Sequence, residues 1–247
     1  METEYYAGIP VDVVTYESII KELPNWFKSN EQKKITSINP QIISFAAKYP
    51  DILTYIEKSN YRLPDGIGIV KLSKLTGGRL KERVTGIELM TLFLYYAAGH
   101  NKKVFLFGSR PDVVKKAAEN IKVDFKLQRC EFLDGYTCLT DDRIIKKINE
   151  SKADFLFVGL GFPLQEKWLA ANSQKVNAKI ILDVGGSFDV LGGKVKRAPL
   201  LIRQYHLEWL YRSFQHPKRL IRIAQLPVFI FLVLTQKNKR LKNSEIK

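Results

Sequence analysis

Cysteine and histidine are scarce in this chain of 247 residues, which has two cysteines and three histidines. Cys130 and Cys138 do not form a CxxC pair, and neither they nor the histidines show the spacing of metal ligands. The sequence therefore predicts no disulfide framework and no metal site. These features are typical of a protein in a reducing cytoplasm.

Long hydrophobic runs are also missing. The longest apolar stretch, residues 226–234, contains Pro227 and is far shorter than the ~20 residues that span a bilayer. The first four residues, Met-Glu-Thr-Glu, include two acidic residues and precede no hydrophobic signal segment. We therefore expect no signal peptide and no transmembrane helix, which leaves peripheral association as the way to reach a membrane.

Three common signatures of nucleotide and sugar-nucleotide sites do not occur. No GxGxxG follows the apolar segment 103–107, there is no GxxxxGK[ST] loop, and no two aspartates stand two positions apart as in a DxD metal clamp. A phosphate leaving group would therefore have to be stabilised by backbone amides and basic side chains. The sequence thus predicts a metal-independent site.

The net charge of +15 is concentrated after residue 193, where 13 lysines and arginines stand against Glu208 and Glu245. Residues 200–234 are rich in Leu, Ile, Trp and Phe as well as basic. A helical segment of this composition is typical of proteins that bind an anionic membrane surface. Nucleic acid is the competing partner, but no nucleic-acid-reading motif is present. The side chains that we expect to bind lipid headgroups or a diphosphate are Arg203, Arg212, Arg219 and Arg222.

The remaining chain alternates strand-like and helix-like segments. Strands are predicted over 34–38, 103–107, 125–132, 153–158 and 179–184, and helices over 42–48, 85–98, from 109 onward and over 165–171. Thr85 and Glu88 have the spacing of a helix capping box. The pattern predicts an α/β fold with a Rossmann-like parallel sheet flanked by helices. We expect a core of residues 1–195 and a basic, amphipathic helical appendage of residues 196–247.

Small and polar residues recur where the predicted strands end. Because ligands of parallel sheets bind at the carboxyl ends of the strands, and because glycine lets backbone amides approach a diphosphate, these residues favour a nucleotide pocket. Ordinary loop geometry is the alternative explanation for any single glycine. The glycines concerned are Gly108, Gly159, Gly161, Gly185 and Gly186.

Four segments together resemble one known family. They are Thr-Ser-Ile-Asn-Pro at 36–40, Pro-Asp-Gly-Ile-Gly-Ile-Val at 64–70 with Arg-Val-Thr-Gly at 83–86, Val-Gly-Leu-Gly-Phe-Pro-Leu-Gln-Glu-Lys-Trp at 158–168, and Asp-Val-Gly-Gly-Ser-Phe-Asp at 183–189. In order and spacing they are similar to the WecG/TagA/CpsF glycosyltransferases, glycosyltransferase family 26. The resemblance runs from about residue 10 to about residue 225 and is nearest to the TagA-type branch.

This resemblance implies an inverting hexosyltransferase (EC 2.4.1) that needs no metal or other cofactor. Its donor would be UDP-N-acetylmannosamine and its acceptor N-acetylglucosamine on undecaprenyl diphosphate, joined by a β-1,4 linkage for wall teichoic acid or a related cell-surface polymer. The enzyme would work at the cytoplasmic face of the cell membrane. The uronate form of the donor sugar stays open, as does a homo-oligomer. An NAD-dependent Rossmann oxidoreductase is the rival enzyme class, against which the missing GxGxxG counts.

The resemblance also implies roles for individual residues. Inversion needs a base that removes the proton from the acceptor hydroxyl, and Asp65, in a Pro-Asp-Gly turn, matches the family's aspartate. Glu166 is the alternative carboxylate, although its place at a helix start favours an interaction with the helix dipole. Arg83 is expected to face an anion, with a surface salt bridge as the simpler alternative. The polar residues expected to orient the sugars are Ser37, which replaces the family's threonine, Asn39 and Gln165.

Deleting residues 197–247 should abolish both vesicle binding and sugar transfer while leaving a folded core, because the basic and apolar segment would be lost. Vesicle sedimentation and transfer assays, with circular dichroism as the control for folding, would test this. A truncated protein that still transferred sugar to the lipid acceptor would refute the role of the appendage.

Overall fold

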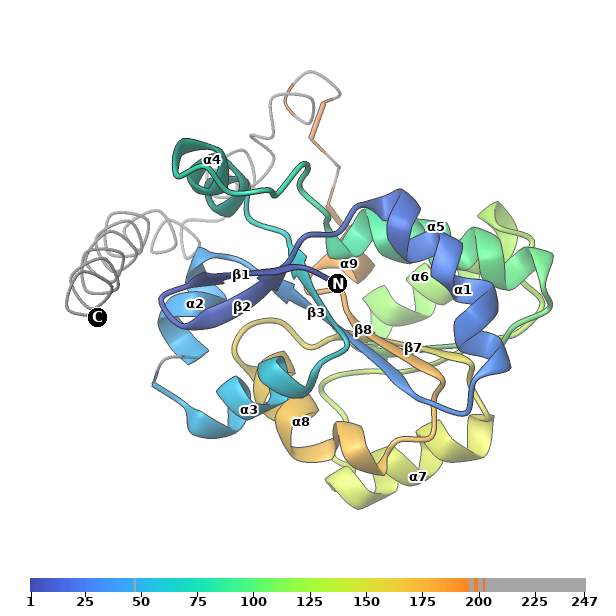
Figure 1. Cartoon of the computed structure of the whole chain (residues 1–247). Helices are drawn as coiled ribbons and strands as arrows, with labels where there is room; N and C mark the ends of the chain where they lie inside the picture. The colour runs from blue at the N-terminus through green and yellow to red at the C-terminus, as the bar shows by residue number, and fades with distance from the viewer. Residues whose placement is uncertain (47, 196–197, 200–201, 203–247) are drawn as a thin grey trace.

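The computed structural model describes residues 1–46, 48–195, 198–199 and 202 (Figure 1). The four arginines of the predicted appendage, from Arg203 to Arg222, lie outside these residues. The boundary between core and appendage therefore stays a prediction. No helix of the described residues is long and apolar enough to cross a membrane.

A six-stranded parallel sheet forms the centre of the protein. Its order is β4-β3-β8-β7-β5-β6. The first and last strands predicted from the sequence, β3 and β8, are therefore neighbours inside the sheet. This confirms the α/β, Rossmann-like fold class. The strands are β3 (Lys33–Ile38), β4 (Tyr61–Pro64), β5 (Val104–Gly108), β6 (Cys130–Leu133), β7 (Phe155–Gly159) and β8 (Ile180–Asp183).

Helices cover both faces of the sheet (Figure 1). Alternate strand residues point to opposite faces, so Phe105 and Phe107 pack into one core, whereas Val104 and Leu106 pack into the other. The first face is covered by α2 (Pro40–Ala46), α3 (Pro50–Lys58), α7 (Asp141–Ser151) and α8 (Leu164–Asn172), and the second by α1 (Tyr16–Lys28), α5 (Gly86–Gly99), α6 (Pro111–Asp124) and α9 (Ser187–Leu191). Helix α4 (Ile67–Leu75) follows β4, and a single 3₁₀ turn (Ser173–Lys175) follows α8.

Local sequence explains where several helices begin. Thr85 is the N-cap of α5, where its hydroxyl accepts from the Glu88 amide, and Pro111 opens α6 as expected. The Thr85 amide donates to the Tyr16 hydroxyl at 2.7 Å, and that hydroxyl donates to Glu88 at 2.7 Å. A tyrosine from α1 is therefore built into the predicted capping box.

One predicted strand has the wrong bounds. The segment 125–132 was expected to be extended, but α6 continues to Asp124, Phe125 is its C-cap, and the strand β6 covers only Cys130–Leu133. The apolar side chains of Phe125 and Leu127 pack against the same core as α6. They belong to the turn after the helix, so only the end of the predicted segment is a strand.

An N-terminal hairpin, which the sequence did not reveal, holds β4 in place. It pairs β1 (Thr3–Tyr6) with β2 (Ile9–Asp12), and it ends at the fully buried carboxylate of Asp12. Asp12 accepts from the Arg62 amide at 2.7 Å, from both sides of the Arg62 guanidinium at 2.8 and 3.0 Å, and from the Thr3 hydroxyl at 2.8 Å. Because Arg62 lies in β4, the hairpin fixes the strand that leads to Asp65.

Replacing Asp12 by alanine should lower the free energy of unfolding by about 3 kcal/mol, because it leaves the Arg62 guanidinium largely buried without its carboxylate. Urea denaturation would measure the loss. Glu17→Ala, which removes only an exposed pair with Lys21, is the matched control and should leave the unfolding midpoint unchanged. Equal midpoints for both variants would contradict the role of the hairpin.

Candidate functional site

The carboxyl ends of β3 and β4 place two polar residues side by side. Ile38 pairs with Pro64 in the parallel ladder, and the next residues are Asn39 and Asp65. The Asp65 amide donates to the Ile38 carbonyl at 3.0 Å. A β-carbon on Gly66 would lie 2.7 Å from the ring of Pro40, so only glycine permits this close approach of the two strand ends.

Asp65 is held by Arg83. The guanidinium donates through Nε to the Asp65 carbonyl and through Nη2 to Asp65 Oδ1 at 3.0 Å. The Asp65 side chain is 24% exposed and the Arg83 side chain 16%, so the pair is neither fully buried nor a simple surface salt bridge. Among the described residues, Asp65 Oδ2 has no donor. One oxygen is thus fixed by arginine, and the other is available to a ligand.

Asn39 and Ser37 lie at the same edge. Asn39 Oδ1 accepts from the Gln41 and Ile42 amides at 3.0 and 3.1 Å and so caps α2. Its amide nitrogen has no acceptor among the described residues and can donate to a ligand. The first turn of α5 approaches the Ser37 hydroxyl closely, because a β-carbon on Gly86 would lie 3.4 Å from it. Four predicted site residues, including Asp65 and Arg83, therefore meet at one edge of the sheet.

The predicted glycines also meet at this edge, on β5, β7 and β8, and they fall into two groups. Gly108 pairs with Gly159, and a β-carbon on Gly108 would lie 2.3 Å from the Gly159 carbonyl oxygen. Close backbone packing, and not a ligand, explains these two. Gly161 and Gly185 have φ values of 79° and 49°, with no atom within 4 Å of an added β-carbon. Their open, left-handed backbone leaves room for a ligand to approach these turns.

Gly186 and Ser109 complete the edge. Gly186 is the N-cap of the short α9. The Ser109 hydroxyl, at the end of β5, donates to Asp189 of α9 at 3.3 Å, and the Ser109 carbonyl accepts from Gly135 at 2.8 Å. The chain leaves β7 toward the α8 face and β5 toward the α6 face, so the direction of the connections reverses here, at the kind of position where such sheets bind nucleotides.

Beneath this edge lies a carboxylate that sequence analysis assigned no role. Asp183, at the end of β8, is 1% exposed and accepts from the Thr36 hydroxyl at 2.8 Å and from the Ser37 amide at 2.9 Å. Burial, together with the nearby charge of Glu166, raises its pKa to about 7, although the hydrogen bonds from Ser37 and Thr36 oppose this shift. The one feature of the sequence that could have indicated Asp183 is its position, an acidic residue at the end of a fully buried strand.

Gln165 and Glu166 belong to the same buried cluster. Gln165, 5% exposed, accepts from the Gly185 amide at 3.0 Å and donates to Glu166 at 3.3 Å. It therefore holds the turn after β8 against the first turn of α8, and its contact with sugar stays a prediction. Burial and the charges of Asp183 and Glu166 raise the pKa of Tyr55, which comes from α3. Tyr55 and Thr36 were not singled out by sequence.

No group of three or more His, Cys, Asp and Glu side chains that could hold a metal ion occurs among the described residues. Whether the reaction depends on a metal is not tested by the geometry, and metal independence stays a prediction. The groups at the described edge that could face a phosphate are the amide of Gly161 and the first turns of α6 and α8.

Glycine turns, helix N-termini and a paired carboxylate lie together at the carboxyl edge of a parallel sheet, where α/β proteins of this class bind their ligands. The model of the glycosyl transferase WecG/TagA/CpsF family matches residues 5–243. The chain belongs to this family, as its motifs indicated, which decides against an NAD-dependent oxidoreductase.

Two similar proteins come from Staphylococcus aureus strains MW2 and NCTC 8325. Each is 32% identical to this chain over 234 residues, which is 94% of this chain and 92% of the relative. Both are named N-acetylglucosaminyldiphosphoundecaprenol N-acetyl-beta-D-mannosaminyltransferase. The similarity covers the described residues of the site from both halves of the sheet.

Asp183→Asn should change how stability depends on pH. Between the ordinary carboxyl pKa of 3.8 and the folded value of about 7, the folded protein holds a proton that the unfolded chain has lost. The stability that Asp183 contributes is therefore fully present below about pH 3.8 and is lost as the pH rises through about 7. Asparagine does not titrate. The free energy of unfolding of the variant should therefore rise relative to that of the wild type by up to about 1.4 kcal/mol per pH unit across this window. Urea denaturation at pH 5, 6, 7 and 8 would measure it, and parallel curves would rule out the shift.

Proposed function

We propose that this protein transfers an N-acetyl-β-D-mannosaminyl group from UDP-N-acetylmannosamine to N-acetylglucosaminyldiphosphoundecaprenol, with inversion at the anomeric carbon. The observation that carries the proposal is the Asp65 carboxylate beside Asn39, fixed by Arg83 at the same edge as the open glycine turns. The names of the relatives supply the acceptor and the sugar. The product would enter wall teichoic acid or a related cell-surface polymer.

Asp65 is the base in this scheme. Its free oxygen takes the proton of the acceptor hydroxyl while the hydroxyl oxygen forms a bond to the anomeric carbon. The bond from that carbon to the β-phosphate oxygen breaks, and UDP leaves with the electron pair. The ion pair with Arg83 keeps the carboxylate in one orientation. Asn39 can donate to the acceptor sugar through its free amide hydrogens.

The leaving diphosphate gains negative charge as the bond breaks. The backbone amide of Gly161 and the N-terminal turns of α6 and α8 would supply fixed partial positive charge at the same edge. This arrangement would stabilise the leaving group without a DxD metal clamp. The arginines predicted after residue 202 would add charge, and they would bring the site to the polyprenyl lipid on an anionic membrane surface.

Asp65→Asn should lower kcat by about 10²–10⁴-fold, because the amide cannot accept the proton. Transfer from UDP-N-acetylmannosamine to a lipid-diphosphate N-acetylglucosamine analogue would be measured. Glu150→Gln, on the outer face of α7, is the matched control and should retain full activity. An asparagine variant as active as the control would remove Asp65 from the mechanism.

The same assay tests the metal and the sugar. Treatment with EDTA should leave the rate unchanged, whereas a metal-dependent transfer would stop and resume on addition of Mg²⁺ or Mn²⁺. Assays with UDP-N-acetylmannosamine and with its uronate form test which donor the enzyme uses. We expect turnover of the uncharged sugar only. Preferred use of the uronate would overturn the assignment of the donor but leave the role of Asp65 intact.

A further inference from the structure

A second cavity lies away from the proposed active site, between α3 and α8. Its volume is about 620 Å³. The lining side chains that matter are Lys34, Tyr49, Lys58, Lys167, Ser173 and Gln174, and we call the cavity the lysine groove. Lys34 is near the start of β3, five residues before Asn39, which corresponds to about 16 Å along the strand. The lysine groove is therefore separate from the edge that carries Asp65.

Lys34 is an unusual residue for its position. It alternates with Thr36 and Ile38 on the face of β3 that packs under α3 and α8, where an apolar side chain is expected. The residue is only 8% exposed and lines the groove. No carboxylate or other acceptor for its ammonium group occurs among the described residues. The side chain is mostly covered, but its ammonium group is not fully enclosed, so Lys34 presents a cation to the groove.

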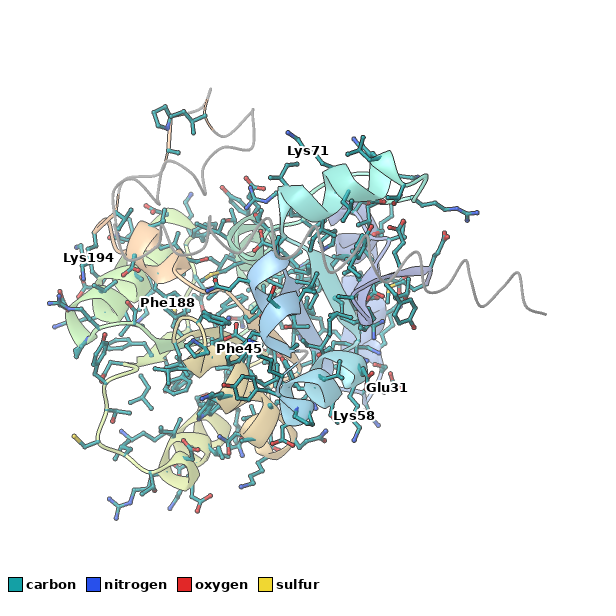
Figure 2. The ribbon with its side chains drawn as sticks, turned by 90° about the vertical axis from the view of Figure 1, so that its left-hand side faces the viewer. Glu31, Phe45, Lys58, Lys71, Phe188 and Lys194 are labelled. Carbon is teal, nitrogen blue, oxygen red and sulfur yellow. The ribbon has the colours of Figure 1, made fainter. Side chains whose placement is uncertain are left out.

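The surrounding charge has the same sign. Burial, and then the nearby charge of Lys58, lowers the pKa of Lys34, which places the two ammonium groups close enough to repel each other. Figure 2 marks Lys58 at the end of α3. Asp51 is the acidic residue among the lining side chains, but it begins α3, seven residues from Lys58 and about 10 Å away along the helix. The Lys34 end of the groove therefore lacks a counter-charge.

The opposite end has a different character. Lys167 lies over the ring of Tyr49, 5.6 Å from its centroid, and Ile52 and Ala170 add apolar wall. The volume is several times what a bare phosphate needs and is typical of pockets for small organic ligands. The groove thus offers a cationic end for an anion and an aromatic end for an organic body.

We infer that the lysine groove binds a phosphate monoester, with the phosphate between Lys34 and Lys58 and the organic part toward Tyr49. Ammonium groups bind phosphate as compact point charges, and a dianion would cancel the repulsion between the two lysines. The phosphate could belong to a soluble metabolite or to a lipid headgroup, and both present the same group to the lysines. The site does not depend on the proposed transferase activity.

Binding to the full-length protein would be measured by titration calorimetry with inorganic phosphate and with glycerol 3-phosphate. Sedimentation with phosphatidic acid vesicles, compared with phosphatidylcholine vesicles, forms the lipid arm. Lys34→Met should lower the affinity for the preferred ligand by about tenfold or more, because it removes a charged hydrogen-bond donor. Lys115→Met, on α6 at the opposite face of the sheet, removes one exposed charge and should bind like the wild type.

Loss of glycerol 3-phosphate binding in Lys34→Met identifies a metabolite site, and loss confined to the phosphatidic acid vesicles identifies a headgroup site. A wild type that binds none of the probes, or a Lys34→Met variant that binds them as tightly, overturns the inference. The comparison of variants also separates this groove from phosphate bound at the carboxyl edge.

Thermal unfolding gives a second readout. Without ligand, Lys34→Met should unfold at a higher temperature than the wild type, because a partly desolvated charge that Lys58 repels is gone. With phosphate, the wild type should gain stability and the variant should not. If Lys34 served only to hold the fold, its replacement would lower the unfolding temperature, which would contradict the inference. Lys58→Met, an exposed residue, should fold normally and weaken binding several-fold, so the test does not rest on one variant.

Discussion

The carboxylate of Asp183 joins β8 to β3 at the point where the backbone ladder between them stops. The last paired residues are Ile35 and Leu182, and beyond them Asp183 accepts hydrogen bonds from the Thr36 hydroxyl and the Ser37 amide. The Asp183 side chain thus joins β8 to β3 where backbone hydrogen bonds no longer do so, and the two strand ends can lie further apart. The positions of Ser37 and Asn39, and through the β3–β4 pairing that of Asp65, depend on this buried contact.

Two aspartates at one edge of the sheet therefore have opposite environments. Asp65 is partly exposed and paired with Arg83. Asp183 is buried beside Glu166, and its pKa of about 7 means that it is often neutral near physiological pH. Carboxyl groups separated in this way can take separate tasks. The exposed one is suited to proton transfer, and the buried one to holding the strands that position it.

The sequence was informative where the signal was local. Apolar runs bounded by glycine predicted β5, β7 and β8, and the Thr85 and Pro111 signals placed the starts of α5 and α6. The family motifs indicated the residues that meet at the carboxyl edge. The pairing of Asp183 with Thr36 could not be read in the same way, because 147 residues separate them. Nor could the hairpin contact of Asp12 with Arg62, since burial, and not the local pattern, makes that carboxylate matter. The segment 125–132 misled because an apolar helix end and a short strand have similar composition.

The alternating side chains of β3 take part in the lysine groove, in the contact with Asp183 and in the candidate site. On one face, Lys34 enters the lysine groove and Thr36 binds Asp183, whereas Ser37 lies near α5 on the other. The helices that wall the groove also lead to the site. Helix α3 runs through a short turn into β4 and so to Asp65, and the first turn of α8 carries Gln165, which holds the Gly185 turn. The two walls of the groove therefore connect to different halves of the candidate site.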